Sequence, residues 1–176
     1  CLPDAEAAKA AEDYLDQKIA ECDSVGGVVE CVISGLPVGL GEPVFEKLDA
    51  NLAKAILSIG AVKGFEIGDG FAATKACGSE NNDEFRMDGD KIVKETNHAG
   101  GVLGGISDGS DVVFRAAFKP TPSIAKSQET VTKDGANIDL VIHGRHDPVV
   151  VPRAVVVVES MAAITAMDML LGSMTS

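Results

Sequence analysis

The sequence contains no tryptophan and only one tyrosine, so its core cannot depend on large aromatic side chains. Six phenylalanines are the remaining aromatics, while hydrophobic residues make up 45% of the 176 residues. A chain of this length can bury a sizeable core. We therefore expect one folded domain over residues 1–176, with a mainly aliphatic interior.

Long apolar runs are also missing. No uninterrupted run reaches the ~20 residues that a membrane-spanning helix needs, and no signal-peptide pattern follows the first residue. The sequence therefore predicts a cytoplasmic protein with no membrane partner. It begins with Cys1 rather than methionine, and we expect it to be a fragment of a longer chain.

Paired cysteines are absent, because Cys1, Cys22, Cys31 and Cys77 form no CxxC motif. This spacing gives little support to a metal or redox site. We expect reduced and mostly buried thiols, as is usual in intracellular proteins.

Positive charge is scarce. Fifteen lysines and arginines against 27 acidic residues give a net charge of −12, which argues against nucleic acid as a partner. Residues 1–96 hold 9 basic and 19 acidic groups, whereas residues 97–153 hold six of each. An anionic ligand would meet the least opposing field in this middle stretch, although a short chain can show such patchiness by chance.

Hydrophobic periodicity predicts three helices. Apolar residues recur at three- and four-residue spacing over 3–22 and over 42–59, where Phe45 and Leu48 begin the apolar side and Gly60 fits the position after the helix. The third helix, over 152–171, is apolar almost all round, which suits burial on most sides. Its valines at 155–158 would also suit a strand.

Alternating patterns predict strands over 28–34, 61–67 and 111–119, with a further hairpin over 128–131 and 138–143. In 111–119 the alternation is strict. The polar stretch 74–96 has no period, and we expect a mobile loop there, either a lid or a disordered segment. This order of elements predicts an α+β fold with an antiparallel sheet packed against helices.

The first segment that could bind a ligand is residues 97–109, with five glycines. Its spacing matches neither a Walker loop nor the dinucleotide GxGxxG motif. A glycine-rich backbone can approach an anion closely. A simple glycine-rich bend is the alternative.

The second segment is Lys119-Pro120-Thr121-Pro122-Ser123, at the end of a predicted strand. The prolines hold the backbone extended while a lysine and two hydroxyls converge. This combination suits a phosphate group, and a rigid strand exit is the alternative.

The third segment is Gly144-Arg145-His146-Asp147-Pro148, followed by Val151-Pro152-Arg153. Arginine can bind a phosphate or carboxylate with two parallel hydrogen bonds, and the neighbouring His146 and Asp147 could move protons. A metal site at His143, His146 and Asp147 lacks a cysteine partner or a helical HxxxH spacing, so no metal is expected. A charged turn before a helix is the alternative.

Four segments together resemble the chorismate synthase family, in this order along nearly the whole chain: GLPVGLGEPVFEKLDANLAKAILSIGAVKGFEIGDGF, NHAGGVLGGISDG, FKPTPSI and GRHDPVVVPRAVVVVESMAA. The resemblance is to the C-terminal half of a family chain about twice this length. It implies half of a β-α-β sandwich and a homotetramer for the full-length enzyme. It also implies a lyase of the shikimate pathway that converts 5-enolpyruvylshikimate 3-phosphate to chorismate and phosphate with reduced FMN.

The resemblance further implies which residues contact the ligands. The flavin contacts would be Gly60, Ala61, Gly104, Lys119, Pro120, Thr121, Pro122, Ser123 and Arg145. Arg145 and Asp147 would also contact the substrate, and Asp147 matches a family acid near flavin N5 that assists proton movement. Val149 stands where family members often have cysteine, which leaves the mechanism untouched.

The catalytic histidines of the family belong to its N-terminal half, so we expect this chain alone to be inactive. Two alternatives remain open. One is a flavin- or phosphate-binding module without chemistry of its own, and the other is an oligomerisation module.

Overall fold

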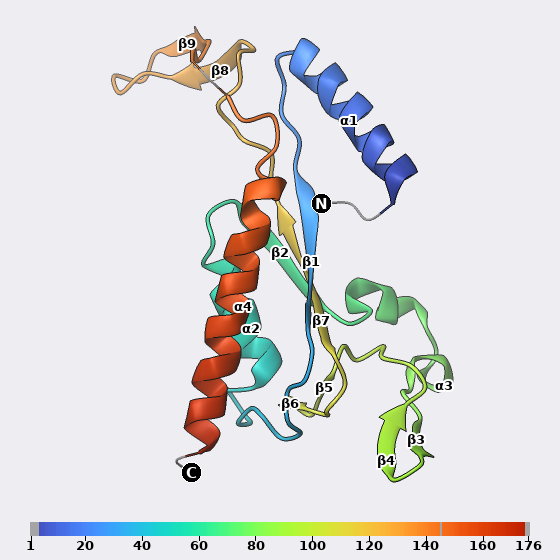
Figure 1. The fold of residues 1–176 in the computed structure, drawn as a ribbon. Coiled ribbons are helices and arrows are strands. Elements are labelled where there is room, and N and C mark those ends of the chain that lie inside the picture. Colours follow the sequence, from blue (N-terminus) through green and yellow to red (C-terminus); the bar gives the residue numbers. More distant parts are fainter. Residues whose placement is uncertain (1–3, 145, 175–176) are drawn as a thin grey trace.

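A computed structural model describes residues 4–144 and 146–174. Its centre is an antiparallel sheet of three strands in the order β1-β7-β2, formed by β1 (Gly27–Ile33), β7 (Val112–Phe118) and β2 (Val62–Ile67) (Figure 1). Phe118, at the end of β7, lies opposite Gly27 of β1 and Val62 of β2. The middle strand is therefore bonded along both edges.

The alternation predicted for β7 is confirmed. Val112, Phe114, Ala116 and Phe118 are buried, and the residues between them are only half-buried. The buried face packs against α2 (Leu48–Leu57) and α4 (Val151–Ser173), which lie together on one side of the sheet (Figure 1). The predicted α+β fold, with an antiparallel sheet packed against helices, is confirmed.

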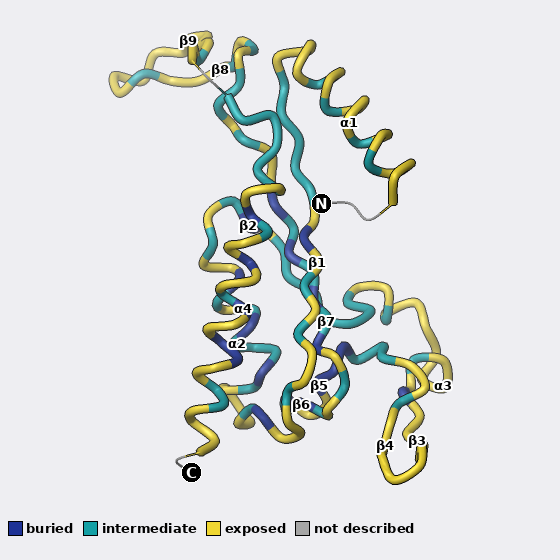
Figure 2. Tube along the Cα trace, viewed as in Figure 1, coloured by how far each residue is buried: buried dark blue, intermediate teal, exposed yellow. Residues whose placement is uncertain are grey.

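The opposite face of the sheet is largely uncovered. Val28 and Val32 of β1 are 58% and 53% exposed. Helix α1 (Ala5–Ala20) begins at Asp4, whose carboxylate accepts a hydrogen bond from Ala7 N at 2.6 Å. It contains no buried residue and projects beside the sheet (Figure 2).

Smaller elements extend from this body. After β2 come the 3₁₀ helix η1 (Gly70–Lys75), the short helix α3 (Gly78–Asn81) and the hairpin of β3 (Phe85–Asp88) and β4 (Lys91–Lys94). The glycine-rich segment forms the two-residue strands β5 (Val102–Leu103) and β6 (Ile106–Ser107). The predicted second hairpin is confirmed as β8 (Gln128–Val131) and β9 (Asn137–Leu140).

The helix predicted over 42–59 starts later, at Leu48. Pro43, which fixes its own φ and carries no N–H donor, lies in a loop over 42–47. Phe45, expected on the apolar side of the helix, is 88% exposed there. The first helical N–H group, at Leu48, instead donates to Gly105 O at 2.8 Å, so a distant segment satisfies the start of α2.

The last helix is confirmed as a helix, but the prediction that it is buried on most sides is wrong. Val156, Ile164, Met167 and Leu171 are 54–62% exposed, and they form one stripe along α4 at helical spacing. The opposite side, which includes Val158, packs on the sheet and on α2. This helix therefore has two apolar faces, of which one is covered in this chain.

By length and composition alone, α4 also resembles a membrane-spanning helix, a test that core helices of other proteins pass too. It packs against β1 and α2 along one side and carries Glu159 and Asp168. The length of α4 therefore does not explain why a stripe of its apolar side chains is exposed.

Two further predictions are corrected. The loop predicted over 74–96 contains α3 and the β3–β4 hairpin, whose turn Gly89 has φ +59°, a geometry typical of Asp-Gly turns. Mobility of this region stays a prediction. The cysteines are not mostly buried, since Cys22 and Cys77 are exposed in the turns that follow α1 and precede α3.

Candidate functional site

Four segments distant in sequence meet at the end of the sheet where β7 stops and β1 starts. Ser24 Oγ donates to Thr121 O at 2.6 Å, across 97 residues of sequence, and Val25 N donates to Pro148 O at 2.8 Å. Lys119 N donates to Ala61 O at 2.9 Å. The structure thus brings the predicted contacts Ala61, Lys119 and Thr121 together and places the segment of Asp147 beside them.

Close backbone packing fixes this junction. A Cβ atom on Gly26 would lie 2.3 Å from Phe118 O and 3.2 Å from Pro120 Cδ. The turn into β1 therefore needs a glycine so that it can lie against the strand exit. Pro120 also restricts the backbone. The segment that follows β7 and carries Lys119 and Thr121 is therefore held both by its contact with Gly26 and by its own proline.

Thr121 has an unusual environment at this junction. Its Oγ1 is the one buried side-chain nitrogen or oxygen without a hydrogen-bond partner in the described part of the chain. Leaving a buried hydroxyl unpaired costs roughly 1–3 kcal/mol. Buried polar groups are almost always paired in native proteins, so this hydroxyl is suited to a partner from outside the described chain.

Lys119 is exposed, and within residues 4–144 and 146–174 its ammonium has no carboxylate partner. The nearby Lys126, in contrast, pairs with Asp23 at 2.6 Å. Beside Lys119, Ala61 has φ +71°, a left-handed conformation that is rare for a residue other than glycine. Gly60 is exposed, and a Cβ there would meet nothing within 4 Å. Neither packing nor backbone conformation therefore requires glycine at position 60.

Asp147 lies between β9 and α4, at the same end of the sheet. Its Oδ2 accepts a hydrogen bond from Arg153 Nη1 at 2.8 Å, with side chains that are 36% and 70% exposed respectively. His146 Nε2 contacts Ile142 O at 3.0 Å. Arg145, a predicted contact of flavin and substrate, lies outside the described residues. Arg153, which follows the third predicted segment, is thus the ion-pair partner of Asp147 at this site.

The remaining predicted contact, Gly104, lies elsewhere. It sits in the tight turn between β5 and β6, with φ +61°. Helix α2 spans the gap between the two places, since Leu48 at its start bonds Gly105 and Gly60 follows its end. Ten helical residues cover roughly 15 Å, so Gly104 and Ala61 do not adjoin in one chain.

The glycines of this segment differ in why they are glycine. A Cβ on Gly100 would lie 2.4 Å from Gly68 N, and one on Gly101 would lie 2.5 Å from Asp111 O. Both have positive φ, so packing and conformation account for them. A Cβ on Gly104 would meet nothing within 4 Å. The surroundings of Gly104 are open, as a ligand contact requires.

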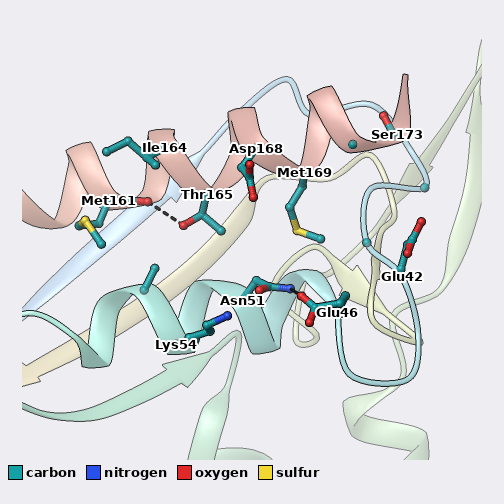
Figure 3. Close-up of a pocket in the computed structure, with 14 residues that line it drawn as sticks. Glu42, Glu46, Asn51, Lys54, Met161, Ile164, Thr165, Asp168, Met169 and Ser173 are labelled. Atoms are coloured by element: carbon teal, nitrogen blue, oxygen red, sulfur yellow. Dashed lines mark hydrogen bonds between the residues drawn. The ribbon is translucent and has the colours of Figure 1, made fainter. Parts of the chain in front are cut away.

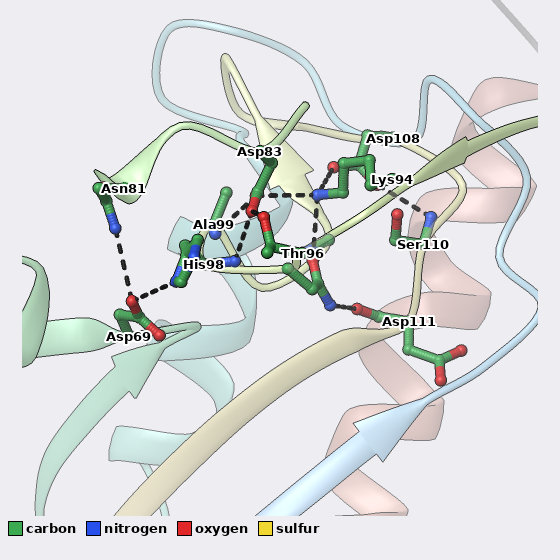
Figure 4. A network of polar contacts seen from close by, with 12 residues as sticks. Asp69, Asn81, Asp83, Lys94, Thr96, His98, Ala99, Asp108, Ser110 and Asp111 are labelled. Atoms are coloured by element: carbon green, nitrogen blue, oxygen red, sulfur yellow. Dashed lines mark hydrogen bonds and ion pairs between the residues drawn. The ribbon is translucent and has the colours of Figure 1, made fainter. Parts of the chain in front are cut away.

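Beside the glycine-rich segment lies a polar network that the sequence analysis missed (Figure 4). The Lys94 side chain is 2% exposed and pairs with Asp108 at 2.7 Å and Asp83 at 3.1 Å, which are 7% and 2% exposed. Its Nζ also donates to Asn97 Oδ1 at 3.0 Å. A buried ammonium is thus fully partnered by oxygens.

Asp83 is the most heavily bonded carboxylate of this network. Burial by itself raises its pKa, but hydrogen bonds from Ala99 N, Thr96 Oγ1, His98 N and Lys94 outweigh burial and hold the pKa far below its usual range. Nearby, His98 Nδ1 contacts Asp69 Oδ2 at 2.6 Å. The partners of Asp83 come from the stretch that the sequence analysis predicted to be a loop and from the segment that follows it.

A cleft of about 460 Å³ lies between α2 and α4 (Figure 3). Lys54 and Asn51 line it from α2, and Thr165 and Asp168 from α4. None of the predicted ligand contacts lies in it. It adjoins Ile164, which belongs to the exposed apolar stripe of α4.

Comparisons with known proteins match the chain to one family. Residues 1–171 match the family model described as chorismate synthase. Chorismate synthases of Lachnoclostridium phytofermentans and Agathobacter rectalis are 66% and 65% identical, over 100% and 98% of this chain and 48% and 47% of their own. A crystal structure of chorismate synthase is similar with a TM-score of 0.79 and 33% identity, over 98% of this chain and 45% of that one. The chain spans about half the length of the curated relatives it matches.

Proposed function

The chain belongs to the chorismate synthase family, and from this premise we propose that it is the C-terminal half of an enzyme of the shikimate pathway. The full-length parent would convert 5-enolpyruvylshikimate 3-phosphate to chorismate and phosphate with reduced FMN. It would act on this small molecule in the cytoplasm, without nucleic acid or membrane as a partner. This chain alone would be inactive, because it has half the family length.

The observation that carries the proposal is the junction of Ala61, Lys119 and Thr121. Among residues 4–144 and 146–174, Lys119 has no acidic partner and the buried Thr121 hydroxyl has no hydrogen-bond partner, and both adjoin a rigid strand exit. An anion would satisfy both groups, since an ammonium and a hydroxyl are natural donors to a phosphate oxygen. These residues fit the anionic flavin that the family uses.

Each residue at this junction would have a distinct task. Lys119 would balance negative charge, Thr121 and Ser123 would donate hydrogen bonds, and Pro120 and Pro122 would hold these donors in place. Reduced FMN, when bound, supplies the electron-rich ring that allows phosphate to leave without net oxidation. The protein would orient both reactants and exclude water around them.

Asp147 would hold or move the proton that leaves the substrate. Its carboxylate is about one-third exposed and lies at the same end of the sheet as Lys119. Its ion pair with Arg153 supports a fixed orientation, which proton transfer requires. Arg145, two residues before it, would bind anionic groups of the flavin and the substrate.

Gly104 would contact a flavin held by another copy of the chain. Its separation from Ala61 by the length of α2 supports this assignment, as does the open space around it. A homotetramer would supply such a neighbour. The exposed apolar stripe of α4 and the cleft beside it would be covered by the N-terminal half of the same parent.

An anaerobic assay of the full-length parent with reduced FMN and 5-enolpyruvylshikimate 3-phosphate tests the proposal. We expect release of phosphate together with a conjugated diene product, and no turnover by residues 1–176 alone. Flavin binding without turnover by the parent would instead favour the binding-module alternative. Turnover by residues 1–176 alone would contradict the assignment to an incomplete enzyme.

A further inference from the structure

The Lys94 network carries an inference that does not follow from the family assignment. A buried ammonium is strongly unfavourable unless it is paired and hydrogen-bonded. Lys94 meets this requirement with two carboxylates and one amide oxygen, all within 3.1 Å. Loss of any one of these bonds would leave a buried charge unpaired at a large cost in free energy. The network therefore holds in place the elements that carry Lys94 and its partners.

These elements include both ends of the glycine-rich segment. Asp83 accepts from the backbone N–H groups of His98 and Ala99, at the entry of the segment. Asp108 lies at its exit, where its own N–H donates to Gly101 O at 3.1 Å. Lys94 Nζ bonds the carboxylates of both Asp83 and Asp108, so a single nitrogen atom connects the two ends of the glycine-rich segment (Figure 4).

Asn97 makes the connection tighter. Its Oδ1 accepts from Lys94 Nζ and from Gly101 N at 2.8 Å, and its Nδ2 donates to Asp111 O at 2.8 Å. The Asn97 side chain therefore bonds Lys94, the backbone of the glycine-rich segment and the start of β7. Through it, Lys94 is coupled to the turn that precedes β5.

The segment needs such an external constraint because its own backbone is unusually free. Gly100, Gly101, Gly104 and Gly105 all have positive φ, between +61° and +91°. Glycine visits many other conformations in solution and loses more conformational freedom than any other residue when it is fixed. Local sequence therefore does not hold this conformation, and its bonds to neighbouring elements must do so.

We propose that Lys94 is a positioning residue for the Gly104 turn, and that it controls flavin affinity through the glycine-rich segment without touching the flavin. Only the identity of the ligand rests on the proposed function. The constraint on the segment is a property of the protein alone. The two parts can therefore be measured separately.

The test compares Lys94→Met with Lys91→Met in the full-length parent. Lys91 lies on the same strand but is exposed, so its loss controls for charge. Without flavin, we expect Lys94→Met to raise hydrogen exchange of the Gly101–Ser107 amides relative to those of β7. With flavin, we expect its Kd for FMN to rise about tenfold, the effect of a loosened supporting shell. Lys91→Met should change neither quantity.

A second pair of variants separates positioning from general instability. Val158→Ala removes core packing in α4 and should lower the melting temperature while leaving FMN affinity unchanged. Should Lys94→Met not fold, Asp108→Asn weakens one ion pair with little change of shape and should shift both readouts in the same direction. Unchanged exchange at Gly101–Ser107 in the folded variant overturns the proposal, and so does increased exchange with unchanged FMN affinity. If Lys119→Ala also leaves FMN affinity unchanged, the flavin site itself fails, whereas the exchange result still stands.

Discussion

The two ends of the central sheet treat polar groups in opposite ways. At the end near the glycine-rich segment, Lys94 and its carboxylates are almost completely buried and bond one another. At the other end, Lys119 is exposed without an acidic partner and Thr121 Oγ1 is buried without any partner in the described chain. Both ends contain charged and polar residues in the sequence, so polarity alone did not reveal which end leaves such groups without a partner.

The difference teaches how to separate a structural polar cluster from a candidate site. A network whose members satisfy one another offers no group to a ligand, and its loss should appear first as lost stability. A junction that leaves a donor unpaired makes that donor available to a ligand but lowers the stability of the fold, as functional sites often do. The predictions that follow test this contrast, beginning with the largest expected effect.

At the end of the sheet with Lys119 and Thr121, Asp147→Asn should have the largest effect on rate. The substitution keeps the shape of the side chain but removes its charge and basicity. In the full-length parent, turnover should fall by roughly 10²–10⁴-fold, the usual span for a lost general acid or base. Single-turnover kinetics at saturating flavin and substrate measure this.

The ion pair with Arg153 supplies the control for Asp147. If Asp147 only braces Arg153, then Arg153→Gln should lower the rate as much as Asp147→Asn, and binding of both ligands should weaken in each variant. A near-normal rate for Asp147→Asn would remove this residue from the catalytic set.

At the network end, Asp83→Ala should have the largest effect on stability. It leaves Lys94 buried with one carboxylate fewer and leaves the N–H groups of His98 and Ala99 unpaired. The free energy of unfolding should fall by about 3 kcal/mol. Urea denaturation of the parent measures it, and the neighbouring Glu84→Ala is the control, since Glu84 is 65% exposed in its ion pair with Arg86.

Exposed pairs of this kind contribute about 0–1 kcal/mol, so Glu84→Ala should be nearly neutral. Equal effects of the two substitutions would mean that the buried network contributes no more than a surface ion pair. The contrast between the two ends of the sheet would then lose its physical basis.

The same network predicts how stability depends on pH. Because hydrogen bonds hold the folded-state pKa of Asp83 well below its unfolded value, this group stabilises the fold above the unfolded pKa and less as pH falls through the folded one. Asp108, where burial raises the pKa but bonds from Lys94 and Ser110 outweigh it, acts in the same direction. The melting temperature should therefore fall as pH drops below about 5. The fall should be shallower in Asp83→Asn, and an unchanged profile would contradict this account.

Much of the fold could be predicted from the sequence because its signals are local. The alternation along β7 lies within seven residues, and it placed Phe114 and Phe118 on the buried face correctly. The start of α2 could not be predicted in this way, since the group that bonds its first N–H, Gly105 O, belongs to a segment far along the chain. The outer face of α4 was predicted to be buried because its residues are apolar, but composition does not show how many sides of a helix are covered by other elements.

For the candidate site, too, local signals could be predicted from the sequence and contacts between distant segments could not. The Lys119–Ser123 segment could be found because a lysine, prolines and hydroxyls lie within five residues. Asp83, Lys94 and Asp108 are 11 and 14 residues apart and match no motif, so only the fold brings them together. The family resemblance likewise gave Gly104 and Lys119 as contacts of one flavin, whereas the structure separates them by the length of α2.

A smaller effect, on affinity alone, is expected at Lys119. In the full-length parent, Lys119→Ala should weaken FMN binding by about 1–3 kcal/mol, the scale of a charge-assisted hydrogen bond. Stability should hardly change, because an exposed lysine without an ion pair contributes little to it. Fluorescence quenching of FMN measures the affinity, with Lys133→Ala, exposed beyond β8, as a control. Equal affinity in both variants would make Lys119 an ordinary surface residue.

The smallest expected effect is also the most direct test of the unpaired hydroxyl. Thr121→Val replaces the buried Oγ1 with a methyl group of similar size and leaves the backbone acceptor of Ser24 Oγ in place. Without flavin, an unpaired hydroxyl is a cost, so the variant should be as stable as the parent or more stable by about 1 kcal/mol. With flavin, the lost hydrogen bond should weaken binding by about 1 kcal/mol. Calorimetric melting with and without FMN measures both, and Thr121→Ser, which keeps the hydroxyl, should retain the parent's affinity. A variant that loses stability without flavin would show that the hydroxyl already has a partner within the protein, and Thr121 would then resemble the Lys94 end of the sheet rather than a ligand site.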